Sequence, residues 1–320
     1  MSAPIIAPPL HAAEPLFRSG FGPATRVEAV QPAESFIVGK DAATGADWSA
    51  LGGPESPIAG LAGRIFINVA DKNPSHAGAE VVRTHPAGPS NPALRLWVLD
   101  DDPASSWVTR SCIRLDYRYG TVAKPEFAFR RCHVKYRMLL AAEYAAHITT
   151  ARNEWFQIFE TWDCGRQWNQ PELSINVRVI KNGSKFNLEF SKRIKGTDGK
   201  FTVAHRMQNA SFSLPFGRWV DVEFYYNPGF ENEKGRFLWR MDGTTVFDIA
   251  AGDRIDGKPV VLNDGRPIMN VQPMKIYQAD ALIDRMRAAG TPCQAWYDDF
   301  EYRDELPVAS EQQCIPAGKQ

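Results

Sequence analysis

Short segments in which apolar and polar residues alternate recur along most of this 320-residue chain. Residues 110–120 (RSCIRLDYRYG) and 129–140 (FRRCHVKYRMLL) are two examples. Because successive side chains of a strand point to opposite sides, a period of two predicts strands with one apolar and one polar face. Helical periodicity is confined to short segments at 139–147 and 277–290, and the second ends in Gly290, a typical helix stop. The pattern favours an all-β fold with short helices.

Turn signals connect the predicted strands into antiparallel pairs. Residues 173–193 read as two strands joined by Asn182-Gly183, a dipeptide typical of two-residue hairpin turns. Further strand segments follow at 217–229, 235–249 and 293–304. A sheet with one apolar face buries that face against a second sheet, so we expect an antiparallel β-sandwich.

The strand segments follow one another without a linker-like change in composition, which predicts a single domain over residues 16–304. Residues 40–92, rich in Gly, Pro, Ala and Ser, read as long loops on this domain. The Pro-rich residues 1–15 predict an extended N-terminal arm, and residues 305–320 predict a C-terminal tail.

The overall charge is balanced, with Lys plus Arg and Asp plus Glu both at 37. This balance excludes a general attraction to nucleic acid or to an anionic membrane, so an anionic partner requires local clustering of basic residues. No apolar stretch approaches the ~20 residues of a membrane-spanning helix. The five cysteines are odd in number and lack Cys-x-x-Cys spacing, which predicts reduced, packed thiols and no structural zinc site.

Basic and amide side chains gather on the polar faces of the predicted strands. If these strands belong to one sheet, the faces form a surface suited to the carboxylate or sulfate groups of an acidic polysaccharide. The alternative is that each face is simply solvated. The residues of these faces are Arg114, Arg118, Arg131, His133, Lys135, Arg137, Asn176, Arg178, Lys275 and Tyr277.

The aromatic-rich segment WFQIFETWDCGRQW, at residues 155–168, predicts a strand with one face in the core and the other in a site. Strict alternation places Trp155, Gln157 and Phe159 on the same face. Aromatic rings stack on the apolar faces of sugars, and amide groups bond to hydroxyls. We therefore expect Trp155 and Gln157 to contact a glycan, with Trp168 at the rim.

From about Phe17 to Tyr302 the chain resembles the concanavalin A-like jelly-roll superfamily, especially its heparinase I-like and alginate-lyase-like polysaccharide lyases. The resemblance rests on the order of the segments RLDYRYG, WFQIFETW, GRWVDVEFYYNP, GRFLWRMDGTTVFDI, MKIYQA and WYDDFEY. WFQIF stands where these lyases carry a Gln-Ile-His-like strand, and MKIYQ resembles their Lys-Ile-Gly-x-Tyr-like strand. The resemblance implies a jelly-roll sandwich that works on polysaccharides.

In such lyases, amide or basic groups neutralise the sugar carboxylate, and a Tyr or His removes the C5 proton. The resemblance implies Gln157 as the neutralising group, Tyr277 as the tyrosine of the lyase strand and Lys275 as a carboxylate contact. The histidine expected two residues after Gln157 is Phe159. His133 is the substitute if its strand lies beside the other two. This departure favours binding over cleavage.

Other site chemistries have weaker signals. Glu154 and Glu160 are six residues apart and would share a face, as a glycosidase pair requires, only in a regular strand. The run Asp100-Asp101-Asp102 reads as a turn, with structural Ca²⁺ as the alternative. The sequence indicates no other cofactor.

Two functions stay open: recognition of an acidic polysaccharide, and a lyase that cleaves uronate-containing chains by β-elimination. A third reading, compatible with both, is a surface component of a phage-like particle. The superfamily works outside the cell, whereas residues 1–15 lack the features of a signal peptide. We therefore expect an extracellular or virion-surface protein, anchored to neighbouring subunits through that arm.

Overall fold

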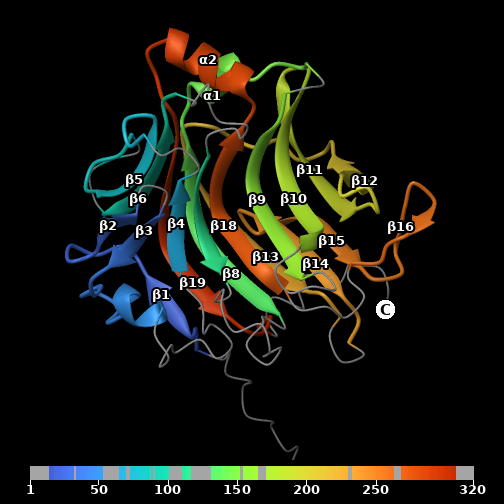
Figure 1. The fold of residues 1–320 in the computed structure, drawn as a ribbon, viewed down its shortest axis with the longest axis horizontal. Helices are drawn as coiled ribbons and strands as arrows, with labels where there is room; N and C mark the ends of the chain where they lie inside the picture. The colour runs from blue at the N-terminus through green and yellow to red at the C-terminus, as the bar shows by residue number, and fades with distance from the viewer. Residues whose placement is uncertain are drawn as a thin grey trace, which may run out of the picture.

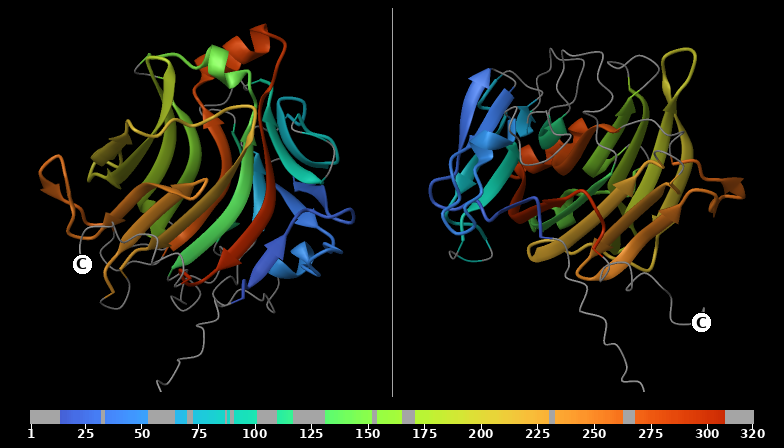
Figure 2. Two further views of the ribbon diagram at one scale, coloured as in Figure 1. Left: turned by 180° about the vertical axis from the view of Figure 1, so that it is seen from behind. Right: turned by 90° about the horizontal axis from the view of Figure 1, so that it is seen from below.

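The computed structural model describes residues 14–31, 34–52, 65–69, 73–86, 88, 91–100, 110–116, 131–151, 154–164, 171–229, 233–262 and 268–307. Most of this part of the chain forms two large antiparallel sheets packed face to face (Figure 1 and Figure 2). The predicted antiparallel β-sandwich is confirmed. The proposed division into an arm, one domain and a tail stays a prediction.

Sheet A contains, in the order of pairing, β15 (Thr244–Ala250), β14 (Arg236–Met241), β13 (Trp219–Asn227), β8 (Cys132–Leu140), β19 (Cys293–Arg303), β6 (Ala93–Val98) and β5 (Ala77–Val82). In addition, β1 (Phe17–Ser19) pairs with β19. Sheet B contains β12 (Phe201–Asn209), β11 (Lys185–Lys195), β10 (Pro171–Asn182), β9 (Phe156–Cys164), β18 (Ile268–Gln278), β7 (Arg110–Asp116), β4 (Ile65–Val69), β3 (Glu34–Val38) and β2 (Arg26–Gln31).

The remaining elements are small. They are a 3-10 turn η1 (Trp48–Gly52), the helices α1 (Tyr144–His147) and α2 (Asp280–Ala288), and a two-stranded ribbon of β16 (Arg254–Ile255) and β17 (Lys258–Pro259). The two helices lie together at one end of the sandwich (Figure 1). No helix in the described part of the chain is long and apolar enough to span a membrane.

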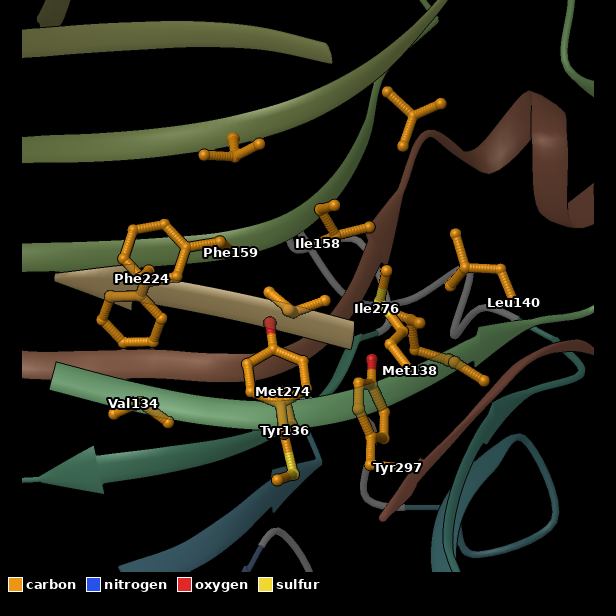
Figure 3. Close-up of a cluster of buried hydrophobic side chains, with 14 of the residues drawn as sticks. Val134, Tyr136, Met138, Leu140, Ile158, Phe159, Phe224, Met274, Ile276 and Tyr297 are labelled. Carbon is orange, nitrogen blue, oxygen red and sulfur yellow. The ribbon is translucent and has the colours of Figure 1, made fainter. Parts of the chain in front are cut away.

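The core lies between the sheets, where apolar side chains of both meet (Figure 3). Val134, Tyr136 and Met138 alternate along β8 and are buried opposite β9 and β18. Burial of each such side chain stabilises the fold by roughly 1.5–3 kcal/mol. The period-two pattern of the sequence is thus the direct cause of the two-layer architecture.

The local predictions are only partly correct. The Asn182-Gly183 hairpin is confirmed, since Asn182 pairs with Lys185 and Gly183 adopts a φ of 60°. The helix predicted at 277–290 is shorter, because Tyr277 and Gln278 still pair with β9 in the sheet. Residues 40–92, predicted as long loops, include the strands β4 and β5. The first is short and the second begins with small residues, so apolar and polar residues alternate little in either.

Two cysteines behave as predicted. Cys132 and Cys293 are buried free thiols. Burial raises the pKa of Cys132 well above its usual range and that of Cys293 to about 12. Both therefore stay protonated at neutral pH, where a thiol acts as a small apolar group.

Candidate functional site

The face of sheet B that points away from sheet A is called the outer face here, and polar side chains cross it in rows from strand to strand. The first row follows the strand register from β18 to β12 and consists of Tyr277, Gln157, Arg178, Glu189 and Gln208. The second row lies beside it and consists of Gln272, Glu160, Asn176, Ser191 and Arg206. Since directly paired residues share a face, each row is one continuous line of neighbouring side chains.

A β-bulge in β9 determines which of its residues reach this face. The pairing with β10 shifts by one residue, so that Gln157 lies opposite Arg178 while Phe159 lies opposite Val177. The extra residue reverses the alternation beyond it, as a bulge does. Glu160, and not Phe159, therefore stands next to Gln157 on the outer face.

The prediction from strict alternation that Phe159 shares the face of Gln157 is wrong. The ring of Phe159 is fully buried in the core, 4.7 Å from the ring centroid of Phe224 and 5.1 Å from that of Trp239. The position taken to favour binding over cleavage is thus a core position, and it carries no information about the chemistry of the site.

Amide groups connect the two rows. Gln157 donates a hydrogen bond from Nε2 to Asn176 Oδ1, and Asn176 Nδ2 donates to Ser174 Oγ at 3.2 Å. Gln157 is only 5% exposed, and its Oε1 accepts no hydrogen bond from any residue that the structure describes. A buried acceptor of this kind is costly unless a ligand or water satisfies it.

A buried ion pair lies beside these amides. Lys275 donates from Nζ to the carboxylate of Glu160 and, at 2.7 Å, to Gln272 Oε1. Lys275 is 0% exposed and Glu160 is 2% exposed. The ammonium also lies 4.8 Å from the ring centroid of Tyr277. The charge of Lys275 is therefore compensated within the protein, which argues against the predicted role of a direct carboxylate contact.

Two arginines of the face share one carboxylate. Arg178 donates to Glu189 at 2.6 Å, and Arg206 lies 3.4 Å from the same Glu189 oxygen. Burial lowers the pKa of Arg178, while Glu189 opposes that shift. Two positive charges against one negative charge leave this group with a net charge of one positive. Arg178 Nε is also buried without a hydrogen-bond partner among the described residues.

Two aromatic rings lie together where the first row begins on β18. The rings of Trp155 and Tyr277 meet edge to face with centroids 4.3 Å apart, and both side chains are half-buried. A cavity of about 440 Å³ opens beside Trp155, and its lining also includes Lys181, Glu189 and Arg206. Ring faces, charged groups and open volume are therefore adjacent.

Three predicted site residues lie elsewhere. His133, Lys135 and Arg137 are on β8, which belongs to sheet A, so His133 cannot act beside Gln157 and Tyr277. Alternation shows that side chains share a face, but it does not show which sheet a strand joins. The expectation that all the basic faces form one surface is therefore wrong for this strand.

Acidic partners on the neighbouring strands accompany the β8 residues. His133 is 1% exposed and its Nε2 lies 2.8 Å from Glu223 Oε1, while burial lowers its pKa against the opposing effect of Glu223. Lys135 also lies near Glu223, at 3.5 Å. Arg137 lies 3.5 Å from Asp299 and 3.8 Å from Asp221. Each of these three basic side chains on sheet A therefore has an acidic partner.

The other predicted residues divide into two groups. Arg114 is on β7, the strand next to β18 in sheet B. Arg118 and Trp168 lie outside the described residues.

The structure thus brings together Trp155, Gln157, Asn176, Arg178, Lys275 and Tyr277 on the outer face of sheet B. Sequence reasoning missed Gln272, Glu189 and Arg206 and considered Glu160 only for a glycosidase pair, because only the register places these residues there.

In the described part of the chain, no group of three His, Cys, Asp or Glu side chains is arranged to hold a metal ion. Asp100, one of the residues considered for Ca²⁺, forms an ion pair with Arg287. Asp101 and Asp102 lie outside the described residues.

No protein-family model matches the chain, and no curated protein sequence matches it. Solved structures do resemble it. An endo-β-1,4-glucuronan lyase from the fungus Trichoderma reesei is 13% identical over 73% of this chain and 89% of its own, with a TM-score of 0.43. An alginate lyase from Pseudomonas aeruginosa is 12% identical over 70% and 86%, with a TM-score of 0.40. The similarity is one of fold.

An endo-1,3-β-glucanase from Streptomyces sioyaensis is also similar, at 11% identity over 94% of this chain and 98% of its own, with a TM-score of 0.37. Two of these three similar structures are thus polysaccharide lyases, one of them an alginate lyase. At identities this low, the activities of these enzymes are not transferred to this chain.

Proposed function

We propose that the protein binds an acidic polysaccharide on the outer face of sheet B. The observation that carries the proposal is the first row, in which Tyr277, Gln157 and Arg178 are direct register neighbours from three strands. A half-buried aromatic ring, an amide with a free acceptor and a guanidinium group thus stand side by side. These three groups recognise, in turn, a sugar ring, its hydroxyls and its acid group.

The charge distribution supports an anionic ligand. The group formed by Arg178, Arg206 and Glu189 has one uncompensated positive charge, and Arg206 is 53% exposed. A guanidinium group offers a carboxylate or sulfate two parallel hydrogen bonds. The proposed ligand therefore places an acid group near Arg206, next to the cavity.

The aromatic pair supports a carbohydrate rather than an isolated small anion. Trp155 and Tyr277 are half-buried, whereas the core ring Phe159 is completely buried. The solvent-accessible part of a half-buried ring such as Trp155 packs well against the C–H groups of a sugar. Trp155 also lines the cavity, so a ring bound there remains in reach of Arg206.

The test is a binding titration with alginate, polyglucuronate, pectate and a heparinoid, with neutral β-glucan as the reference polymer. Trp155→Ala and Arg206→Ala should each weaken the binding of an acidic polymer roughly tenfold, and Arg137→Ala on sheet A is the matched control. Equal binding of acidic and neutral polymers, or equal loss with Arg137→Ala, contradicts the proposal.

Cleavage by β-elimination is the second candidate, and the register pairing of Tyr277 with Gln157 favours it. Gln157 would polarise the uronate carboxylate, and the Tyr277 phenolate would take the C5 proton. The electron pair of that C–H bond then forms the C4–C5 double bond, the C4–O bond breaks with its electron pair on oxygen, and the Tyr277 hydroxyl returns the proton to the leaving oxygen. Ultraviolet absorbance of the unsaturated product that rises with wild type and not with Tyr277→Phe identifies a lyase. Binding without such absorbance supports recognition alone.

A further inference from the structure

A second group of aromatic and basic side chains occupies the opposite end of the outer face of sheet B. The next line in the register after the second row, called the third row here, consists of Asn270, Trp162, Ser174, Arg193 and Val203. Phe201, two residues before Val203 on β12, joins this row through ring contacts. The third row is not used by the proposed site around Trp155.

The rings of this group contact each other across three strand intervals. The Trp162 and Phe201 rings meet edge to face with centroids 5.1 Å apart, although Trp162 is on β9 and Phe201 is on β12. Ser174 on β10 lies between them in the row and is fully buried. A small side chain at this position is compatible with contact between rings that belong to strands so far apart in the sheet.

These rings differ from core rings in their exposure. Trp162 and Phe201 are half-buried, whereas Phe159 on the same strand as Trp162 is completely buried. Their positions in the register place them on the face that points away from sheet A. Packing between the sheets therefore does not account for them.

The polar groups of the third row have unused hydrogen-bonding capacity. The Arg193 guanidinium carbon lies 5.4 Å from the centroid of the Phe201 ring, and no hydrogen bond or ion pair joins Arg193 to any described residue. A guanidinium group stacked on a ring still directs its N–H groups outward along its own plane. Asn270 is 3% exposed, and its Oδ1 has no hydrogen-bond partner in the described part of the chain.

We infer that Trp162, Phe201 and Arg193 form a second sugar subsite, which binds an acidic sugar unit of the same polysaccharide chain. This inference rests on the proposed function. The aromatic rings provide a surface for the sugar ring, Arg193 pairs with its acid group, and Asn270 accepts from a hydroxyl. Trp162 lies seven residues after Trp155 on an extended strand, which separates the two subsites by about 20 Å.

This separation has a consequence for ligand length. An oligosaccharide too short to span the sheet occupies one subsite only, whereas a longer chain engages both. The second contact is then intramolecular, and it raises the affinity without any new interaction at the first subsite. The protein should therefore bind long acidic chains much more tightly than short ones.

The test uses isothermal titration of the full chain with uronate oligosaccharides that range from dimer to decamer. Phe201→Ala and Arg193→Ala should each weaken the binding of the longest oligomers about tenfold and leave the dimer unaffected. Thr202→Ala, an exposed position on the same strand that pairs with Ile194 and lies outside the third row, is the matched control and should change neither. Trp155→Ala should weaken the binding of every length.

The outcomes separate this inference from the proposed function. If wild type binds long oligomers and both third-row variants bind them equally well, the second subsite is refuted and the proposed function stands. If the variants lose affinity for the dimer and the decamer by the same factor, the two-subsite arrangement is refuted. If wild type binds none of the oligomers, both proposals fail.

Discussion

Glu160 and Lys275 form an ion pair that is closed off from solvent on the outer face of sheet B. The two residues come from adjacent strands, β9 and β18, and they meet because the bulge in β9 turns Glu160 to that face. The pair compensates both charges at the centre of the candidate site, so this face holds a lysine whose charge is already neutralised within the protein.

Removal of one partner of this pair should destabilise the protein. Glu160→Gln and Lys275→Met each leave an uncompensated buried charge, which typically costs about 3–5 kcal/mol. We expect the double variant to be more stable than the sum of the two single effects predicts, because it leaves no unpaired charge. Urea unfolding followed by tryptophan fluorescence measures all four proteins. Additive effects contradict this coupling.

Phe159→His should not create or improve a lyase. The ring lies between Phe224 and Trp239 in the core, so an imidazole there is buried without a partner and remains remote from the outer face. We expect a loss of several kcal/mol in stability, comparable with the roughly 3–5 kcal/mol of a Phe→Ala change in a core, and no gain in cleavage of uronate polymers. A stable variant with new cleavage activity would show that position 159 belongs to the site.

Glu189→Gln should strengthen the binding of an acidic polymer, in contrast to Arg206→Ala. The carboxylate of Glu189 neutralises one of two guanidinium groups, so its removal raises the net charge of the group from one positive to two positive. We expect severalfold tighter binding at low salt and a smaller gain at high salt, because mobile ions screen the added charge. Unchanged affinity at both salt concentrations would exclude this group from the binding site.

The stability of the protein should fall as the pH rises toward neutrality because of Asp298. Burial, and then the neighbouring carboxylate of Asp299, raise the pKa of Asp298 from 3.8 to about 7, with a smaller contribution from Asp41 and an opposing effect of Arg137. The folded protein therefore keeps a proton that the unfolded chain releases between these two values. The free energy of unfolding decreases through that window and levels off above it.

Asp298→Asn should remove this slope. Above pH 7 we expect the variant to be more stable than wild type by roughly 2–4 kcal/mol, since each unit of pKa shift corresponds to about 1.4 kcal/mol. Below pH 4 the two should be similarly stable. Thermal unfolding at a series of pH values measures the effect, and Asp299→Asn, which removes one cause of the raised pKa of Asp298, should reduce the slope in part. Parallel curves for wild type and Asp298→Asn would refute the assignment.

The sequence by itself determined the layers of the fold. Strand segments such as 131–140, with Val134, Tyr136 and Met138 in alternation, have only one way to bury their apolar face, and that is against another sheet. Asn182-Gly183 likewise determined its hairpin locally, because few dipeptides adopt that turn. The same alternation predicted that the side chains of Trp155 and Gln157 share one face.

The tertiary structure alone decided which polar faces meet. His133 and Gln157 both alternate with apolar residues, yet β8 joins sheet A and β9 joins sheet B, a choice made by contacts between residues distant in sequence. The bulge that places Glu160 instead of Phe159 on the outer face is likewise a property of the pairing between β9 and β10. Alternation in the sequence indicates which side chains of one strand share a face. The register between strands determines which side chains of different strands lie next to each other, and the candidate site depends on that.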